Sequence, residues 1–157
     1  MARSANSPRL IAIAEEIRKA APGKDVHLTD SLDVLTSCSV AVSASNSPNA
    51  LIFPKHLAPG PVVICDIAVP GDVDDSVQKH RPDVEIVRGA LVRLPHNEDF
   101  HIAGMPLSDG YVFPCMAETM LMGLENMRKN GSYGPVTAGQ VQQMCAFANK
   151  HGFSLAE

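Results

Sequence analysis

The chain of 157 residues contains no tryptophan, and aromatic residues make up only 4% of it. We therefore expect a hydrophobic core built from aliphatic side chains, methionine and alanine. The sequence also has no apolar run of the ~20 residues that a membrane-spanning helix needs, so no membrane span is expected. Residues 1–7 lack the apolar segment of a secretion signal. The sequence thus predicts a cytoplasmic protein.

An excess of positive charge and clustered metal ligands are also missing. The formal net charge of -4 argues against a nucleic-acid-binding surface. None of the cysteines belongs to a C-x-x-C pair or has histidines clustered beside it, so we expect no metal site. Without a secretion signal, no disulfide framework is expected either. We expect free thiols, at least three of them small buried core residues, among Cys38, Cys65, Cys115 and Cys145.

The apolar runs that are present predict strands. The clearest is Pro61–Asp66. Similar runs occur at residues 39–43, 84–88 and 91–94, and a shorter one occurs at residues 25–29. Helical segments separate several of these runs, and the runs do not alternate strictly between apolar and polar residues. This pattern indicates a parallel sheet that is covered on both faces.

Helices are predicted at both ends of the chain. Apolar residues from Leu10 to Ile17 recur at helical spacing, with Ser7 as a possible cap and Pro8 in the first turn. The last third reads as one helix with a continuous methionine-rich face over residues 113–127, followed by a helix that Thr137 caps and Gly152 ends.

Cys115 is the candidate nucleophile. It follows Pro114, a favoured first helical residue, so its sulfur is expected in the first turn of the long helix. The free backbone N–H groups and the helix dipole there favour a thiolate, which can attack an acyl carbonyl and hold the acyl group. The alternative is a small buried residue beneath the methionine face. Glu118, one turn on, either orients a substrate or transfers a proton, or it merely complements the helix dipole.

Polar residues end two of the predicted strands. Asp66 closes the clearest strand, and Ser43 and Ser45 lie at and just beyond the end of the preceding one. In open α/β sheets, ligands collect beyond the carboxyl ends of the strands. We expect Asp66 either to contact a ribose or substrate hydroxyl there, or to cap the turn that follows it.

Several segments resemble known oxidoreductases. Residues 39–45, followed by residues 63–70, resemble the second half of a dinucleotide-binding domain of the shikimate dehydrogenase and glutamyl-tRNA reductase superfamily, although Gly71 stands where the latter usually has arginine. Residues 87–92, 115–120 and 151–153 occur in the same order and at similar spacing in long-chain acyl-(acyl-carrier-protein) reductases. That resemblance covers nearly the whole chain.

The resemblance implies an α/β fold: a partial Rossmann-type parallel sheet in residues 1–112, followed by a helical segment, residues 113–157, packed on it. It also implies an NADPH-dependent reductase that takes an acyl group from the thioester of an acyl-carrier protein onto Cys115, with Glu118 beside it, and releases a fatty aldehyde. The cofactor-binding residues that it implies are Arg3 and Ser4 at the adenosine 2′-phosphate, and Ser43, Ala44, Ser45, Asp66, Ala68 and Pro70 at the nicotinamide.

No G-x-G-x-x-G motif occurs in the chain, so the first β-α-β unit and the loop that holds the cofactor's pyrophosphate are expected to be missing. Strands that lose their neighbours leave an apolar edge that invites pairing. We therefore expect weak or absent NADP binding by the isolated chain, which would need a missing N-terminal half or would form a homodimer. Two other interpretations remain open: a different dehydrogenase of the same superfamily, and a truncated, non-enzymatic domain that acts only in assembly.

Overall fold

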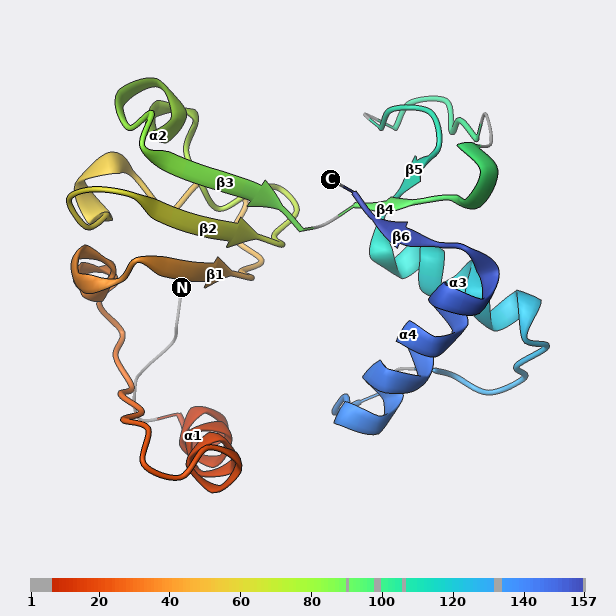
Figure 1. The fold of residues 1–157 in the computed structure, drawn as a ribbon, viewed down its shortest axis with the longest axis horizontal. Coiled ribbons are helices and arrows are strands. Elements are labelled where there is room, and N and C mark those ends of the chain that lie inside the picture. Colours follow the sequence, from red (N-terminus) through yellow and green to blue (C-terminus); the bar gives the residue numbers. More distant parts are fainter. Residues whose placement is uncertain (1–6, 90, 98–99, 106, 132–133, 157) are drawn as a thin grey trace. The chain divides into compact units, whose positions relative to one another are not determined.

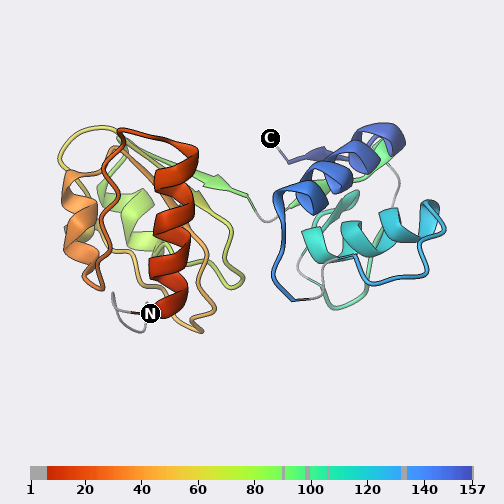
Figure 2. The ribbon, with the colours of Figure 1, turned by 90° about the horizontal axis from the view of Figure 1, so that it is seen from below.

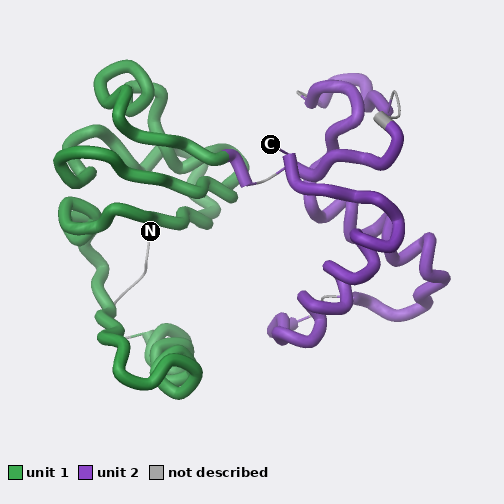
Figure 3. Tube along the Cα trace, in the orientation of Figure 1, with its two compact units in different colours: residues 1–87 green, residues 88–157 purple. Residues whose placement is uncertain are grey.

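The computed structural model describes residues 7–89, 91–97, 100–105, 107–131 and 134–156. The chain divides into two compact units, residues 1–87 and residues 88–157 (Figure 3). The sequence analysis placed this boundary between residues 112 and 113. The observed boundary comes earlier because the strands that follow Arg88 pair only among themselves and do not extend the parallel sheet.

The N-terminal unit contains a three-stranded sheet in the order β1-β2-β3 (Figure 1). Strands β1 and β2 are parallel, and Ser43 lies opposite Asp66 at their carboxyl ends. Three of the five expected strands, those at residues 39–43, 61–66 and 84–88, and their parallel arrangement are confirmed. The elements of this unit are α1 (Pro8–Ala20), η1 (Leu32–Ser37), β1 (Val40–Ser43), η2 (Pro54–His56), β2 (Val62–Asp66), α2 (Asp75–His80) and β3 (Val84–Arg88).

The strand expected at residues 25–29 is absent, and that prediction was wrong. This segment has no regular structure. The Val26 carbonyl accepts a hydrogen bond of 2.8 Å from the Arg18 guanidinium of α1. The hydrogen-bond donor to this carbonyl is therefore a side chain and not a neighbouring strand.

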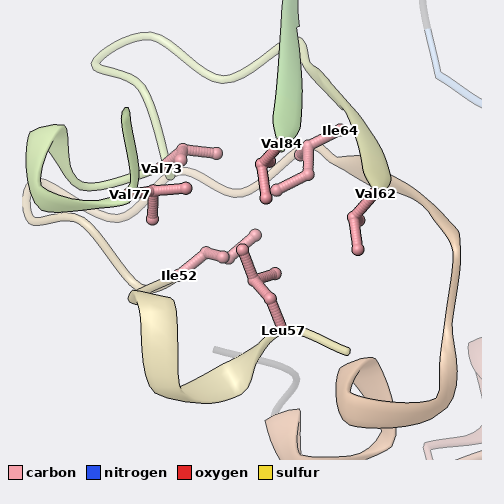
Figure 4. Close-up of a cluster of buried hydrophobic side chains, with 7 residues drawn as sticks. All are labelled: Ile52, Leu57, Val62, Ile64, Val73, Val77 and Val84. Carbon is pink, nitrogen blue, oxygen red and sulfur yellow. The ribbon is translucent and has the colours of Figure 1, made fainter. Parts of the chain in front are cut away.

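Within the described residues of the N-terminal unit, only one face of the parallel sheet is covered. Val62 and Ile64 of β2 and Val84 of β3 point into a core that also contains Ile52, Leu57, Val73 and Val77 (Figure 4). On the other face Val40 and Val42 are 66% and 67% exposed. The expectation that both faces are covered was therefore wrong for this unit, because α2 and η2 both pack on the same side as the core.

The C-terminal unit has its own sheet and its own core. Its strands are antiparallel, in the order β5-β4-β6, and α3 packs against α4 (Figure 2). Leu94, Val112, Ala117, Leu121 and Phe153 form the core. The elements are β4 (Val92–Arg93), η3 (Pro95–Asn97), β5 (Tyr111–Val112), α3 (Pro114–Leu124), α4 (Ala138–His151) and β6 (Ser154–Leu155).

The two helices of this unit begin and end for identifiable reasons. Helix α4 is capped by Thr137 and ends at Gly152, whose φ of 77° suits glycine, as expected. Helix α3 begins at Pro114 as expected but ends at Leu124, shorter than the predicted segment, and Asn126 then takes a φ of 52°. Over the part of the chain that the structure describes, none of the helices has the length and apolar character to span a bilayer.

Candidate functional site

The carboxyl ends of β1 and β2 bring six of the predicted residues together in the N-terminal unit. The Asp66 carboxylate is only 1% exposed. It accepts hydrogen bonds from the Ser43 hydroxyl at 3.0 Å and from the backbone N–H groups of Ala68 and Val73, both at 3.2 Å. These bonds hold the segment after β2 against the end of β1. Asp66 thus caps the following turn, which is one of the two roles that the sequence left open.

A second buried carboxylate at this place was missed by sequence reasoning. Asp72 is 2% exposed and accepts hydrogen bonds from the backbone N–H of Ser45, at 2.9 Å, and from the Ser45 hydroxyl. The Asp72 carbonyl also accepts from the N–H groups of Leu51 and Ile52. The signal in the sequence is that Asp72 directly follows a Pro-Gly pair, Pro70 and Gly71, just beyond the end of a strand. The two carboxylates therefore accept hydrogen bonds from the two serine hydroxyls and from neighbouring backbone N–H groups.

Cys115 and Glu118 lie in the C-terminal unit. Cys115 is the second residue of α3, its side chain is exposed, and its carbonyl accepts a hydrogen bond from the Thr119 hydroxyl at 2.9 Å. The alternative of a buried packing residue is therefore wrong for Cys115. None of the four cysteines is buried, so the expectation of three core cysteines was also wrong.

Both residues line a groove of about 1010 Å³ in the C-terminal unit. One wall comes from α3, with Cys115, Glu118 and Leu121, and the other comes from α4. Three apolar lining residues stay open to solvent: Leu155 is 75% exposed, Val136 58% and Val141 51%. The remaining lining residues are Val92, Pro114, Ala117, Met127, Gly131, Gln140, Gln143, Met144, Cys145, Ala148, Asn149, Phe153, Ser154 and Ala156.

One carboxylate gives this groove its electrostatic character. Among the described residues that line it, Glu118 alone carries a formal charge, and no lysine, arginine or histidine is present. The Glu118 Oε1 atom lies close to Gly131, because a Cβ built on Gly131 would stand 3.1 Å from it. The carboxylate therefore lies beside Gly131 on an otherwise uncharged, mainly apolar surface.

The rim of the groove is held by Gln140. Its Oε1 atom accepts hydrogen bonds from the Thr137 N–H at 2.8 Å and the Thr137 hydroxyl at 2.9 Å, and its amide nitrogen donates to the Gly131 carbonyl at 2.9 Å. The start of α4 is thus tied to the segment beside Glu118. Sequence reasoning did not single out Gln140, although its position three residues after a threonine is the capping-box signature.

The far ends of α3 and α4 are joined by an ion-pair cluster. Glu125, directly after α3, accepts from the Lys150 ammonium at 2.7 Å and pairs with His151 Nε2 at 2.6 Å. The hydrogen bond from Lys150, followed by that from His151, lowers the pKa of Glu125. This cluster fixes the helix pair that carries the groove.

The predicted site residues therefore belong to two separate sets. Ser43, Ala44, Ser45, Asp66, Ala68 and Pro70 belong to the N-terminal unit, and Cys115 and Glu118 to the C-terminal unit. Arg3 and Ser4 lie outside the described residues. No group of three or more histidine, cysteine, aspartate or glutamate side chains suited to a metal ion occurs in the described ranges. Cofactor binding at the strand ends stays a prediction.

Comparison with known proteins points to a different chemistry from the one expected. No protein-family model matches the chain. Over 131 residues, 80% of the chain, it is 33% identical to PigE of Serratia sp. (strain ATCC 39006). That relative is named an aminotransferase. The chain spans only 15% of the length of PigE, so it corresponds to one segment of a much longer protein.

This finding overturns the expected function. An aminotransferase moves an amino group and does not reduce a thioester, so the similarity contradicts an NADPH-dependent acyl-(acyl-carrier-protein) reductase that forms a fatty aldehyde. The description as an oxidoreductase that uses NADP and a cysteine thioester loses its support as well. The segments on which that expectation rested are each only three to eight residues long. Those that form strands indicate a buried strand followed by a turn, and such a similarity indicates a fold and not a reaction.

Proposed function

We propose that this chain is a binding unit in amino-group metabolism and that its C-terminal unit holds an apolar primary amine. The observation that carries the proposal is the groove beside α3 and α4, in which a single carboxylate lies on a largely apolar surface without any cationic side chain among the described lining residues. An amine is either the donor or the product when an amino group is transferred. The similarity to an aminotransferase supports this choice of ligand class.

The apolar lining supplies the attraction for the body of the ligand. Leu155, Val136 and Val141 are all more than half exposed, which is costly for aliphatic side chains unless something covers them. Removing apolar surface from water stabilises a complex by about 25 cal/mol per Å². A hydrocarbon chain in the groove would cover these three residues.

The Glu118 carboxylate supplies the selectivity for the head of the ligand. A protonated amine can donate a hydrogen bond to it. A carboxylate ligand would be repelled by the like charge of Glu118, and none of the described lining residues is a cation that could offset this repulsion. In this proposal Glu118 orients the substrate, as one interpretation of the sequence suggested. The exposed thiol of Cys115 stands on the same helix turn, and its reactivity stays a prediction.

Calorimetric titration of the full chain with octylamine, octanol and octanoate tests the proposal. We expect octylamine to bind more tightly than octanol and octanoate to bind most weakly. The variant Glu118→Gln should lower the affinity for octylamine roughly tenfold, to that for octanol, because the charge-assisted hydrogen bond is lost. The matched control Glu15→Gln removes the same charge from α1 in the other unit and should change nothing.

A second pair of variants tests the position of the carboxylate. In Gly131→Ala the new methyl group would stand 2.9 Å from Met122 Sδ and 3.1 Å from Glu118 Oε1, so the Met122 side chain must move and the carboxylate must give way slightly. Gly139→Ala places the same methyl group in open space. Octylamine affinity should fall only in Gly131→Ala. Equal binding of the three ligands, or an unchanged affinity in Glu118→Gln, would contradict the proposal.

A second proposal concerns the fold of the N-terminal unit. We suggest that its parallel sheet is a partial Rossmann-type sheet related to the shikimate dehydrogenase and glutamyl-tRNA reductase superfamily. The strand order β1-β2-β3 and the polar cluster at the strand ends support this relationship. Titration of the full chain with NADPH tests whether the cluster also serves a nucleotide.

A further inference from the structure

Helix α3 of the C-terminal unit has a hollow on each of two sides. One is the groove that carries Glu118. The other, which we call the second hollow, has a volume of about 610 Å³. None of the described residues that line it carries a charge, an amide or a hydroxyl group. Besides Phe153, its lining consists of Leu94, Pro95, Phe100, Met120, Gly123 and Leu124.

The spacing of residues along α3 shows how the two hollows are arranged around it. Successive residues of an α-helix lie about 100° apart around its axis. The groove therefore takes an arc of about 160°, which contains Ala117, Leu121, Glu118 and Cys115. The second hollow takes an arc of about 100° on the other side, which contains Leu124, Met120 and Gly123. The two arcs meet between Ala117 and Leu124, which are only about 20° apart.

Phe153 is the one described residue that lines both hollows. It is only 7% exposed and belongs to the core of the C-terminal unit. In that core it lies together with Ala117 and Leu121, which line the groove, and with Leu94, which lines the second hollow. The Phe153 side chain therefore stands between the two hollows.

The end of α4 fixes the position of this side chain. The Phe153 N–H donates to the Ala148 carbonyl at 2.9 Å, and the Gly152 N–H donates to the Asn149 carbonyl at 3.4 Å. With Gly152 at a φ of 77°, this is the Schellman arrangement that ends many helices. A Cβ on Gly152 would stand 3.3 Å from the Pro95 Cβ, so the chain passes close to the lining of the second hollow just before Phe153.

We infer that Phe153 limits the length of the hydrocarbon chain that the groove accepts, an inference that rests on the function proposed above. With the amine at Glu118, each methylene group that enters the groove leaves water and tightens binding roughly fourfold. Once the chain reaches the Phe153 ring, further methylene groups stay in water and add nothing. The second hollow lies behind this ring, and its apolar lining would take up those groups if the ring were removed.

Calorimetric titration of the full chain with n-alkylamines, from butylamine to dodecylamine, tests the inference. In the wild type we expect the affinity to rise roughly fourfold per methylene group and then to become constant at one chain length, which we call the break. In Phe153→Ala the break should move to a longer chain, because the second hollow becomes part of the groove. Phe153→Leu keeps more of the core and should move the break in the same direction by less.

Two further variants separate this effect from a general loosening of the core. Phe147→Ala makes the same change at a phenylalanine that packs on the same core but is not among the described residues lining either hollow, so the break should stay in place. Gly123 lines the second hollow, and a Cβ built on it meets no atom within 4 Å. Gly123→Leu should therefore fill this hollow. Alone it should not move the break, and combined with Phe153→Ala it should restore the wild-type break.

The outcomes distinguish a failure of this inference from a failure of the proposed function. An affinity that rises through the whole series in the wild type, without a break, would overturn the inference. So would a break that stays in place in both Phe153 variants, or one that moves equally in Phe147→Ala. The amine site itself would survive these results as long as Glu118→Gln weakens the binding of octylamine. If none of the alkylamines binds to the wild type, the proposed function is wrong and this inference fails with it.

Discussion

Four carboxylates illustrate how the surroundings of a residue decide what it does. Asp66 and Asp72 are almost fully buried and hold backbone at the strand ends. Glu125 joins two helices through Lys150 and His151. Glu118, which is only partly buried, lines the groove without any cation among the described residues around it. Of the four, Glu118 is therefore the carboxylate whose charge a ligand could meet.

Glu125 should make the stability of the C-terminal unit depend on pH. Its pKa lies below the ordinary 4.5 because Lys150 and His151 donate to the ionised form. A carboxyl group whose pKa is lower in the folded state contributes stability above its unfolded pKa and loses it as the pH falls through the folded value. Urea unfolding at several pH values between about 6 and 3 should therefore show a steeper loss in the wild type than in Glu125→Gln.

The control for this experiment is Glu16→Gln on α1, which changes the net charge equally and should keep the steep pH dependence. If the wild type and Glu125→Gln lose stability in parallel below about pH 4.5, the link between α3 and α4 does not act through this ion-pair cluster.

At the scale of elements, the two predicted helix caps behave differently. Thr137 accepts from the Gln140 N–H at 3.3 Å and forms a full capping box. Ser7 precedes Pro8 at the start of α1, but its side chain makes no capping hydrogen bond. The same kind of sequence signal thus produces a cap in α4 and only a helix boundary in α1.

Alanine substitution should separate the two caps. Thr137→Ala should destabilise the protein by about 1 kcal/mol, because the first turn of α4 loses its side-chain acceptor. Ser7→Ala should change stability by only a few tenths of a kcal/mol at most, since there is no bond to lose. Chemical unfolding of the full-length variants measures both. Equal losses would show that the Ser7 hydroxyl caps α1 in solution.

On the scale of the whole molecule, the chain contains two hydrophobic cores that share no residue. One joins β2, β3 and α2 with the segments around Ile52 and Leu57, and the other joins β4, β5, α3 and Phe153. Each unit buries its own apolar side chains. We therefore expect the two units to unfold as separate cooperative transitions.

Core truncations in each unit test this expectation. Leu121→Ala should cost about 2–5 kcal/mol and lower only the transition of the C-terminal unit. Ile64→Val should cost about 0.5–1.5 kcal/mol and lower only the transition of the N-terminal unit. Differential scanning calorimetry of the full chain distinguishes the two. A single transition that both variants shift together would mean that the units fold as one body.

Much of the local structure could be predicted because it depends on neighbours along the chain. The apolar runs gave β1, β2 and β3, and Pro114, Thr137 and Gly152 marked helix boundaries. The candidate site was predicted only in part. Cys115 and Glu118 were found through their helix turn, while Gln140 and Asp72 were not, since their partners, Gly131 and Ser45, lie 9 and 27 residues away.

The sequence by itself determined where the parallel strands and the capped helices form, because backbone preferences and apolar periodicity act over a few residues. Only the tertiary structure decided that the strands after Arg88 build a second sheet, that Val40 and Val42 stay exposed, and that one carboxylate lies in an apolar groove. These features depend on which distant segments pack together, and that choice is made by the burial of apolar surface over the whole chain.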